Sequence, residues 1–187
     1  MKTENSSDEL LVLFVQKNSG KGFEYLVDRY QEKIFNYAKR IVSDPDLAED
    51  ITQESFIAAY SNINSFDPKR KFSSWLYRIA HNKAINEIRK RKKIIFLDEK
   101  IPIESDENSK KITNEIDRKK AKILLEKKLD IIPIKYKETL TLRYFENLSY
   151  EEISDILKIP VSTVGIRIKR GLEKLKKITN ISPEDYL

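Results

Sequence analysis

Residues 149–177 read SYEEISDILKIPVSTVGIRIKRGLEKLKK and predict two helices joined by a tight turn. Ser149 and Glu152 fit a capping box, in which each side chain bonds a free backbone N–H of the first helical turn. Pro160 interrupts the pattern because it disfavours helical geometry at the preceding residue and has no N–H to donate. We therefore expect a short helix that ends before Pro160 and a second helix that begins near Ser162.

The second of these helices has an apolar side and a basic side. Its apolar residues recur at spacings of three and four, which places them together; they are Val161, Val164, Ile168, Leu172 and Leu175. The other side carries Ser162, Ile166, Lys169 and Arg170, flanked by Thr163 and Arg167. Two helices of this kind form a helix-turn-helix, whose basic helix suits a DNA major groove. The alternative is a helical hairpin whose basic face is only solvated.

The composition narrows the class of protein. The 187 residues suffice for one large or two small domains, and only four glycines and six prolines argue against a β-rich chain. A net charge of +6 favours a polyanion partner such as nucleic acid. The absence of cysteine excludes disulfides and thiolate chemistry. No apolar run has the length of a membrane span and no signal-peptide pattern is present, so we expect a cytoplasmic protein without membrane insertion.

The N-terminal part is also predicted to be helical. A short helix is expected over residues 8–17, and a longer one over about 22–42 keeps helical apolar spacing for five turns. Asp44 and Pro45 then supply the cap and first residue of a third helix. That helix shows polar and aromatic residues opposite its core side, namely Glu49, Gln53, Phe56 and Tyr60. This side is a candidate protein-binding surface, unless a neighbouring helix covers the two aromatic residues.

Two adjacent segments have opposite charge. Residues 41–68 contain six acidic residues and no Lys or Arg, whereas residues 69–93 contain ten basic residues and one acid. Opposite charge in neighbouring segments suggests two partners, a basic protein surface and nucleic acid.

The basic segment is predicted to form an amphipathic helix. Arg78, Asn82, Asn86, Arg89 and Lys93 lie opposite its apolar row. Cations beside aromatic residues such as Trp75 and Tyr77 are typical of single-strand binding, where bases stack on rings. For Trp75 the alternative is core packing. The one histidine, His81, has no partner for a metal site.

Three segments, in this order, resemble bacterial sigma factors of the extracytoplasmic-function (ECF) type, in the sigma-seventy superfamily. Residues 46–56, DLAEDITQESF, are similar to the helix with which that family binds the polymerase clamp. Residues 72–82, FSSWLYRIAHN, with the basic run 89–93, are similar to its promoter-melting and minus-ten-reading helix. Residues 148–153, LSYEEI, with the helix that follows, are similar to its minus-thirty-five helix-turn-helix.

The resemblance implies an all-α fold of two small helical domains joined by a flexible linker, with the helix-turn-helix in the C-terminal domain. The expected boundaries are 1–94 for sigma region 2, 95–122 for the acidic linker and 123–180 for sigma region 4. It implies core RNA polymerase (clamp and flap) and promoter DNA as partners, and an anti-sigma factor in many members. It implies no catalytic residue, metal or cofactor, because the polymerase makes the RNA.

The resemblance also implies three sets of site residues. The polymerase-binding residues are Glu49, Asp50, Gln53, Glu54 and Phe56. The minus-ten residues are Trp75, Tyr77, Arg78, Asn82, Asn86, Arg89 and Lys93. The minus-thirty-five residues are Ser162, Thr163, Ile166, Arg167, Lys169 and Arg170. Asn86 replaces the usual Asp of the family, and Gly165 and Ile166 replace a Lys and a small polar residue, which leaves the promoter sequence open.

Two other functions compete with this one. A helix-turn-helix regulator with an N-terminal dimerisation or effector domain would leave the paired acidic and basic segments unexplained. A recombinase or nuclease would need clustered carboxylates for metal ions or an activated nucleophile. The acids here lie mainly at predicted helix starts and in the linker, without a motif-like cluster.

Overall fold

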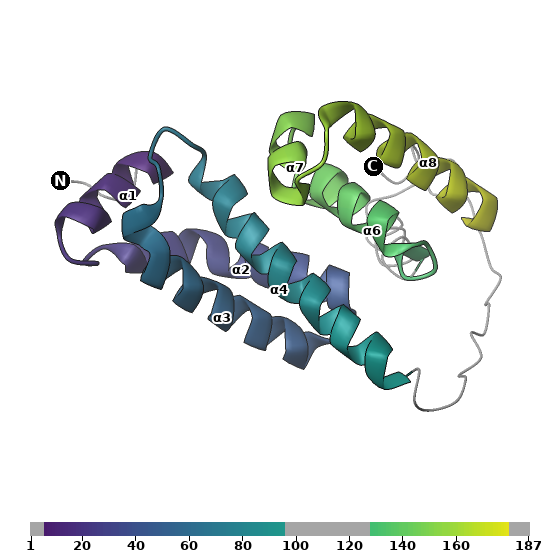
Figure 1. Ribbon diagram of the computed structural model, residues 1–187, viewed down its shortest axis with the longest axis horizontal. Helices are drawn as coiled ribbons and strands as arrows, with labels where there is room; N and C mark the ends of the chain where they lie inside the picture. Colours follow the sequence, from purple (N-terminus) through teal and green to yellow (C-terminus); the bar gives the residue numbers. More distant parts are fainter. Residues whose placement is uncertain (1–5, 96–127, 180–187) are drawn as a thin grey trace, which may run out of the picture.

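The computed structural model describes residues 6–95 and 128–179, and all regular elements within these ranges are helices. This confirms the predicted all-α class. Figure 1 shows α1 to α4, purple to teal, as one body, and α6 to α8, green to yellow, as a second body beside α4. The expected linker, 95–122, lies almost entirely outside the described residues, so the predicted domain boundaries stay predictions.

The N-terminal body is a bundle of four helices, and their bounds agree with the sequence patterns: α1 (Asp8–Lys17), α2 (Phe23–Val42), α3 (Pro45–Asn62) and α4 (Phe72–Ile95). Asp44 caps α3 by accepting a hydrogen bond at 3.1 Å from the N–H of Leu47, with Pro45 in the first turn. The apolar side of α2 faces α3 and α4, and Leu26, Ile34 and Tyr37 are fully buried there. The packed core therefore fixes how α3 and α4 lie against α2 and against each other.

The loop before α4 is held by α1. It begins with a short 3-10 turn, η2 (Ile63–Ser65). The side-chain amide of Gln16 donates hydrogen bonds to the carbonyl oxygens of Ile63, at 2.7 Å, and Phe66, at 2.9 Å. Phe66 is buried against Phe72 and Trp75. The side chain of Gln16 thus fixes the start of this loop to α1.

The C-terminal body contains α6 (Ile134–Leu140), η3 (Thr141–Phe145), α7 (Tyr150–Leu157) and α8 (Val161–Thr179). The helical path continues beyond α6 as a π-helical turn, η3. The predicted capping box of α7 is present: Ser149 Oγ accepts from the N–H of Glu152, and Glu152 accepts from the N–H of Ser149. Gly171 lets α8 approach α6 closely, because a Cβ there would lie 2.9 Å from a methyl carbon of Leu140.

One residue of the predicted apolar side of α8 is exposed in the structure. Val164, Ile168 and Leu175 are buried and Leu172 is half-buried, as expected. Val161, however, is the first residue of α8 and is 41% exposed. The pattern grouped Val161 with the apolar side of the helix, but at the helix start its side chain is exposed.

The two bodies are packed against each other. α4 contacts α7, and α2 contacts both α6 and η3. α3 runs along the side of the N-terminal body that faces away from α6, α7 and α8 (Figure 1). The C-terminal body therefore covers part of α4 and leaves α3 uncovered.

Candidate nucleic-acid and protein interfaces

The outer face of α3 is exposed and acidic. Four of the five residues expected to bind polymerase are exposed here: Glu49, Asp50, Gln53 and Glu54. The side chain of Glu54 pairs with Lys83 of α4 at 2.9 Å. None of the carboxyls on this face is held in a buried network. All of them are therefore accessible to a basic protein surface.

Phe56, the fifth residue of this set, lies in the core instead. It is 8% exposed and packs edge-on against Phe23 of α2, with ring centroids 6.4 Å apart. Its position falls at the edge of the exposed arc of α3, where a large apolar side chain turns inward. The exposed apolar residues are Ile57, at 59%, and Tyr60, at 49%. The sequence prediction missed Ile57, although it follows Asp50 and Gln53 at helical spacing and so lies in their stripe.

A groove of about 580 Å³ lies between residues of α3 and α4, which pack against each other. Asp50 and Glu54 line it from α3, and Asn86 and Arg89 line it from α4. Residues expected to bind polymerase and residues expected to bind DNA thus share one groove. A further ion pair, Arg91 to Asp44 at 2.7 Å, joins α4 to the start of α3.

The minus-ten residues on α4 fall into two groups. Asn82, Asn86 and Arg89 are exposed, as a DNA-reading surface requires. The side chain of Lys93 lies outside the described part of the structure. The other three residues, Trp75, Tyr77 and Arg78, are engaged within the protein.

The aromatic side chains of Trp75 and Tyr77 on α4 pack within the protein. Trp75 is half-buried and stacks on Phe66 and Phe72, with ring centroids 4.9 and 5.8 Å away. Tyr77 is only 3% exposed, and its hydroxyl donates to Glu146 at 2.5 Å. Burial, together with the Glu146 carboxylate, raises the pKa of Tyr77 far above its ordinary value. Tyr77 was therefore wrongly expected at the surface, because Glu146 comes from a distant part of the sequence.

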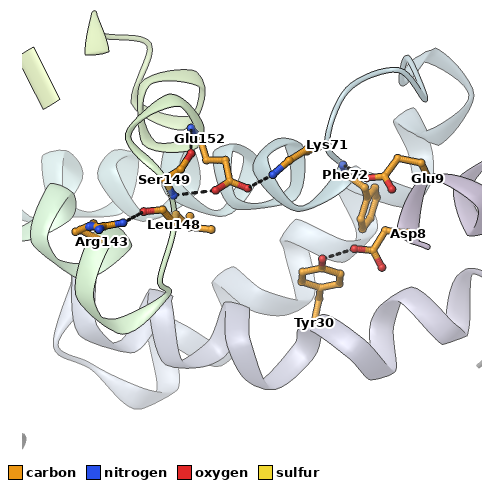
Figure 2. Close-up of polar contacts among 9 residues, drawn as sticks. All are labelled: Asp8, Glu9, Tyr30, Lys71, Phe72, Arg143, Leu148, Ser149 and Glu152. Carbon is orange, nitrogen blue, oxygen red and sulfur yellow. Dashed lines mark hydrogen bonds and ion pairs between the residues drawn. The ribbon is translucent and has the colours of Figure 1, made fainter. Parts of the chain in front are cut away.

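Helix α7 places two carboxylates on the basic start of α4. Glu152 accepts from Lys71 at 2.9 Å with one oxygen and from the Ser149 N–H at 2.8 Å with the other (Figure 2). Burial alone would raise the pKa of the Glu152 carboxyl, but these hydrogen bonds hold it below its usual value. Asp155 pairs with Arg78 at 3.4 Å and approaches Arg70 at 4.0 Å.

A buried polar cluster joins α4, α6 and α8. Glu138 of α6 pairs with Arg167 of α8 at 2.7 Å and lies 3.8 Å from His81 of α4. The hydroxyl of Tyr37 lies 2.9 Å from the other ring nitrogen of His81. Burial, with Arg167 and Arg89 nearby, lowers the pKa of His81 to about 4, so the ring is neutral at pH 7. The sequence suggested no role for His81, and only the packing of the two bodies gives it one.

The outer face of α8 matches the predicted minus-thirty-five surface in part. Ser162, Ile166, Lys169 and Arg170 are exposed, and Thr163 is half-buried. Ile166 is 51% exposed, so a large apolar side chain stands among polar and basic ones. Arg167 instead turns toward Glu138 and is not presented with the others.

The described residues hold no group of three or more His, Asp or Glu side chains that could bind a metal ion. None of the described helices is long and apolar enough to cross a membrane.

Comparison with known proteins matches both bodies to one family. Residues 26–94 match the profile of Sigma-70 region 2, and residues 122–175 match that of Sigma-70, region 4. The chain is 41% identical to the ECF RNA polymerase sigma factor SigW of Bacillus subtilis over 171 residues, which is 87% of this chain and 91% of that protein. It is 37% identical to the ECF RNA polymerase sigma-E factor of Haemophilus influenzae, over 92% of this chain and 95% of that one.

Solved structures share the fold. CnrH, determined in complex with the cytosolic domain of CnrY, superposes with a TM-score of 0.69 at 21% identity, covering 92% of this chain and 96% of that one. RpoE of Bartonella quintana, determined with the anti-sigma factor NepR, gives 0.67 at 21% identity, covering 84% and 96%. The two region profiles, the order in which they occur and the full-length relatives lead to one conclusion: the chain belongs to the ECF sigma factors of the sigma-70 family.

Proposed function

We propose that the two helices lining the α3–α4 groove of this sigma factor bind different partners. α3 binds the clamp of core RNA polymerase, and α4 holds the unpaired non-template strand of the minus-ten element. The observation that carries the proposal is the groove itself, with acidic Asp50 and Glu54 on one wall and Asn86 and Arg89 on the other. One wall fits a basic protein surface, and the other fits phosphate and base edges.

On α4, Asn82 is the proposed base reader, because its exposed amide offers both a donor and an acceptor to one base. Arg89 and Arg78 are the proposed phosphate contacts. Trp75 supports the melted strand by stiffening the end of the helix through its contacts with Phe66 and Phe72. Neutralising Arg89 should weaken binding to all sequences and lower the salt slope by about one unit.

In the C-terminal body, α8 is the proposed reader of the minus-thirty-five element, and the body also binds the polymerase flap. Lys169 and Arg170 are exposed for phosphate or guanine, with Ser162 and Thr163 at the helix start on the backbone. No catalytic group of the chain's own is required, since the polymerase makes the RNA. We propose that this sigma factor acts in the cytoplasm, where polymerase and DNA are found. We also propose an anti-sigma factor as a further partner, as NepR is for RpoE.

Transcription in vitro with core polymerase on genomic DNA, with start sites mapped, tests the function. Specific start sites should appear only when the chain is added, and they should share two upstream elements. Strand opening at those sites, followed with permanganate, should be lost in Asn82→Ala combined with Trp75→Ala. Normal opening in that double variant would show that the melting surface is wrongly placed.

A further inference from the structure

Four acidic residues of the C-terminal body face the N-terminal body. Glu146 accepts from Tyr77, Glu152 accepts from Lys71 just before α4, and Asp155 pairs with Arg78. A fourth carboxylate, Glu138, lies beside His81 in the buried cluster. Arg78, a proposed contact for DNA phosphate, therefore meets a carboxylate of its own chain.

We propose that the acidic side of the C-terminal body is a ligand of α4 that competes with promoter DNA. The inference rests on the proposed function of α4 as the strand-binding helix. Carboxylates and phosphate oxygens both accept charge-assisted hydrogen bonds from Lys and Arg, so one set of cations serves either partner. A DNA phosphate and the C-terminal body cannot occupy Arg78 together.

The contact is more than a set of surface ion pairs, each of which would contribute little. Lys137 of α6 is 5% exposed, and its ammonium group donates to the carbonyl of Ile41 at 3.1 Å and the hydroxyl of Ser43 at 3.0 Å. These groups end α2, where the helix dipole favours a cation. Asp130 completes the site at 2.5 Å from the same ammonium nitrogen. The buried hydrogen bonds from Lys137 to Ile41 and Ser43 thus form only while the two bodies stay together.

The closed arrangement affects the proposed DNA surface of α4. It engages Arg78 through Asp155, while Asn82 and Arg89 stay exposed. The pair of Arg167 with Glu138 lies within the C-terminal body and does not depend on closure. The closed chain should therefore bind DNA weakly, and opening should restore the missing phosphate contact on α4.

The test compares two charge reversals on the same helix. Asp155→Arg places a cation against Arg78 and Arg70 and should open the chain. Glu151→Arg is the matched control, because Glu151 is exposed on α7 and pairs with none of the described cations of the N-terminal body. Binding to a fluorescent single-stranded DNA of mixed sequence is measured by anisotropy at fixed salt. Asp155→Arg should tighten binding about tenfold, as expected if the open fraction rises from about a tenth to nearly all.

An equal gain in both variants would mean that added charge alone is responsible, and would overturn the proposal. No gain in Asp155→Arg, while Arg89→Ala still weakens DNA binding, would overturn the competition and leave the function of α4 intact. If Arg89→Ala has no effect either, α4 is not the DNA surface and both ideas fail. Asp155→Asn adds no cation and should give a smaller gain in DNA affinity in the same direction. It replaces Asp155→Arg in the test if Asp155→Arg does not fold.

Opening is measured separately with two fluorophores. The chain has no cysteine, so Glu32→Cys on α2 and Glu173→Cys on α8, both exposed positions, give one label on each body. Energy transfer should be lower in Asp155→Arg than in wild type or Glu151→Arg. Equal transfer in all three would overturn the proposal.

Discussion

The outer face of α3 and the face of α4 that meets α7 differ in both charge and exposure. The α3 face is acidic and open, with Asp50 and Gln53 exposed. The α4 face is basic and covered, with Tyr77 and Arg78 engaged by the C-terminal body. Packing the two bodies together therefore leaves the proposed polymerase surface available and occupies part of the proposed DNA surface. The difference suggests an order of events in which polymerase binds first and DNA follows.

The largest expected effect concerns the open face. Replacing Asp50 and Gln53 together with Lys should weaken binding to core polymerase by roughly 3 kcal/mol, because two cations would face a basic clamp. A titration with core enzyme measures this, and circular dichroism should show unchanged helix content. The same exchange at Gln31 and Glu32, exposed on α2, is the control. Equal affinity of the two double variants would reject the assignment of α3.

The second effect concerns what holds the covered face in place. Lys137→Met should lower the free energy of unfolding by about 2 kcal/mol, because the Ile41 carbonyl and Asp130 lose a buried charged donor. Denaturant titration measures the change. Lys135→Met, at an exposed position on the same helix, should change it by no more than about 0.5 kcal/mol. Similar losses in both variants would show that the buried ammonium has no special role in the contact.

The third effect is a dependence of folding stability on pH, which arises from His81 in the contact between the two bodies. The pKa of His81 is about 4 in the folded chain against 6.5 ordinarily, so the unfolded chain binds the extra proton between these values. Stability should therefore fall by about 1 kcal/mol from pH 7 to pH 5.5. Burial raises the pKa of neighbouring Glu138, which works in the opposite direction.

His81 is the only histidine, so His81→Gln should flatten the stability profile between pH 7 and pH 5.5. Unfolding transitions in a pH series measure both proteins. A slope that persists unchanged in the variant would contradict the burial of a neutral ring at this position.

The smallest effect concerns Ile166, exposed on α8 in both open and closed chains. We propose that it packs against the methyl group of a thymine in the upstream element. A base-by-base scan should find one position where thymine is favoured by about 0.8 kcal/mol, the value of one methyl-sized apolar group. Uracil at that position, or Ile166→Ser, should remove the preference. Full tolerance of uracil at every position would reject the contact.

Local sequence signals predicted the helices well. Asp44 with Pro45, and Ser149 with Glu152, marked helix starts that the structure reproduces, because capping is decided within one turn of the chain. Phe56 and Val161 depart from their helical patterns for the opposite reason. Each lies at the edge of a helical stripe, where the neighbouring helix decides which way the side chain turns.

The candidate sites were predictable only in part for the same reason. The exposed residues Asn82 and Ile166 followed from their helices alone. The partners of Tyr77 and Arg167 did not follow in this way. Glu146 meets Tyr77 across the contact between the two bodies, and Glu138 meets Arg167 through the packing of α6 against α8. No periodicity within one segment reports a contact between segments far apart in the sequence.

Energy transfer between labels at Glu32→Cys and Glu173→Cys during a titration with core polymerase, without DNA, tests the proposed order most directly. The free chain should show high transfer, and core polymerase should lower it as α3 binds and the C-terminal body leaves α4. DNA alone, at the same salt, should change it little. Low transfer in the free chain, or high transfer that persists in the complex with polymerase, would contradict a closed chain that polymerase opens.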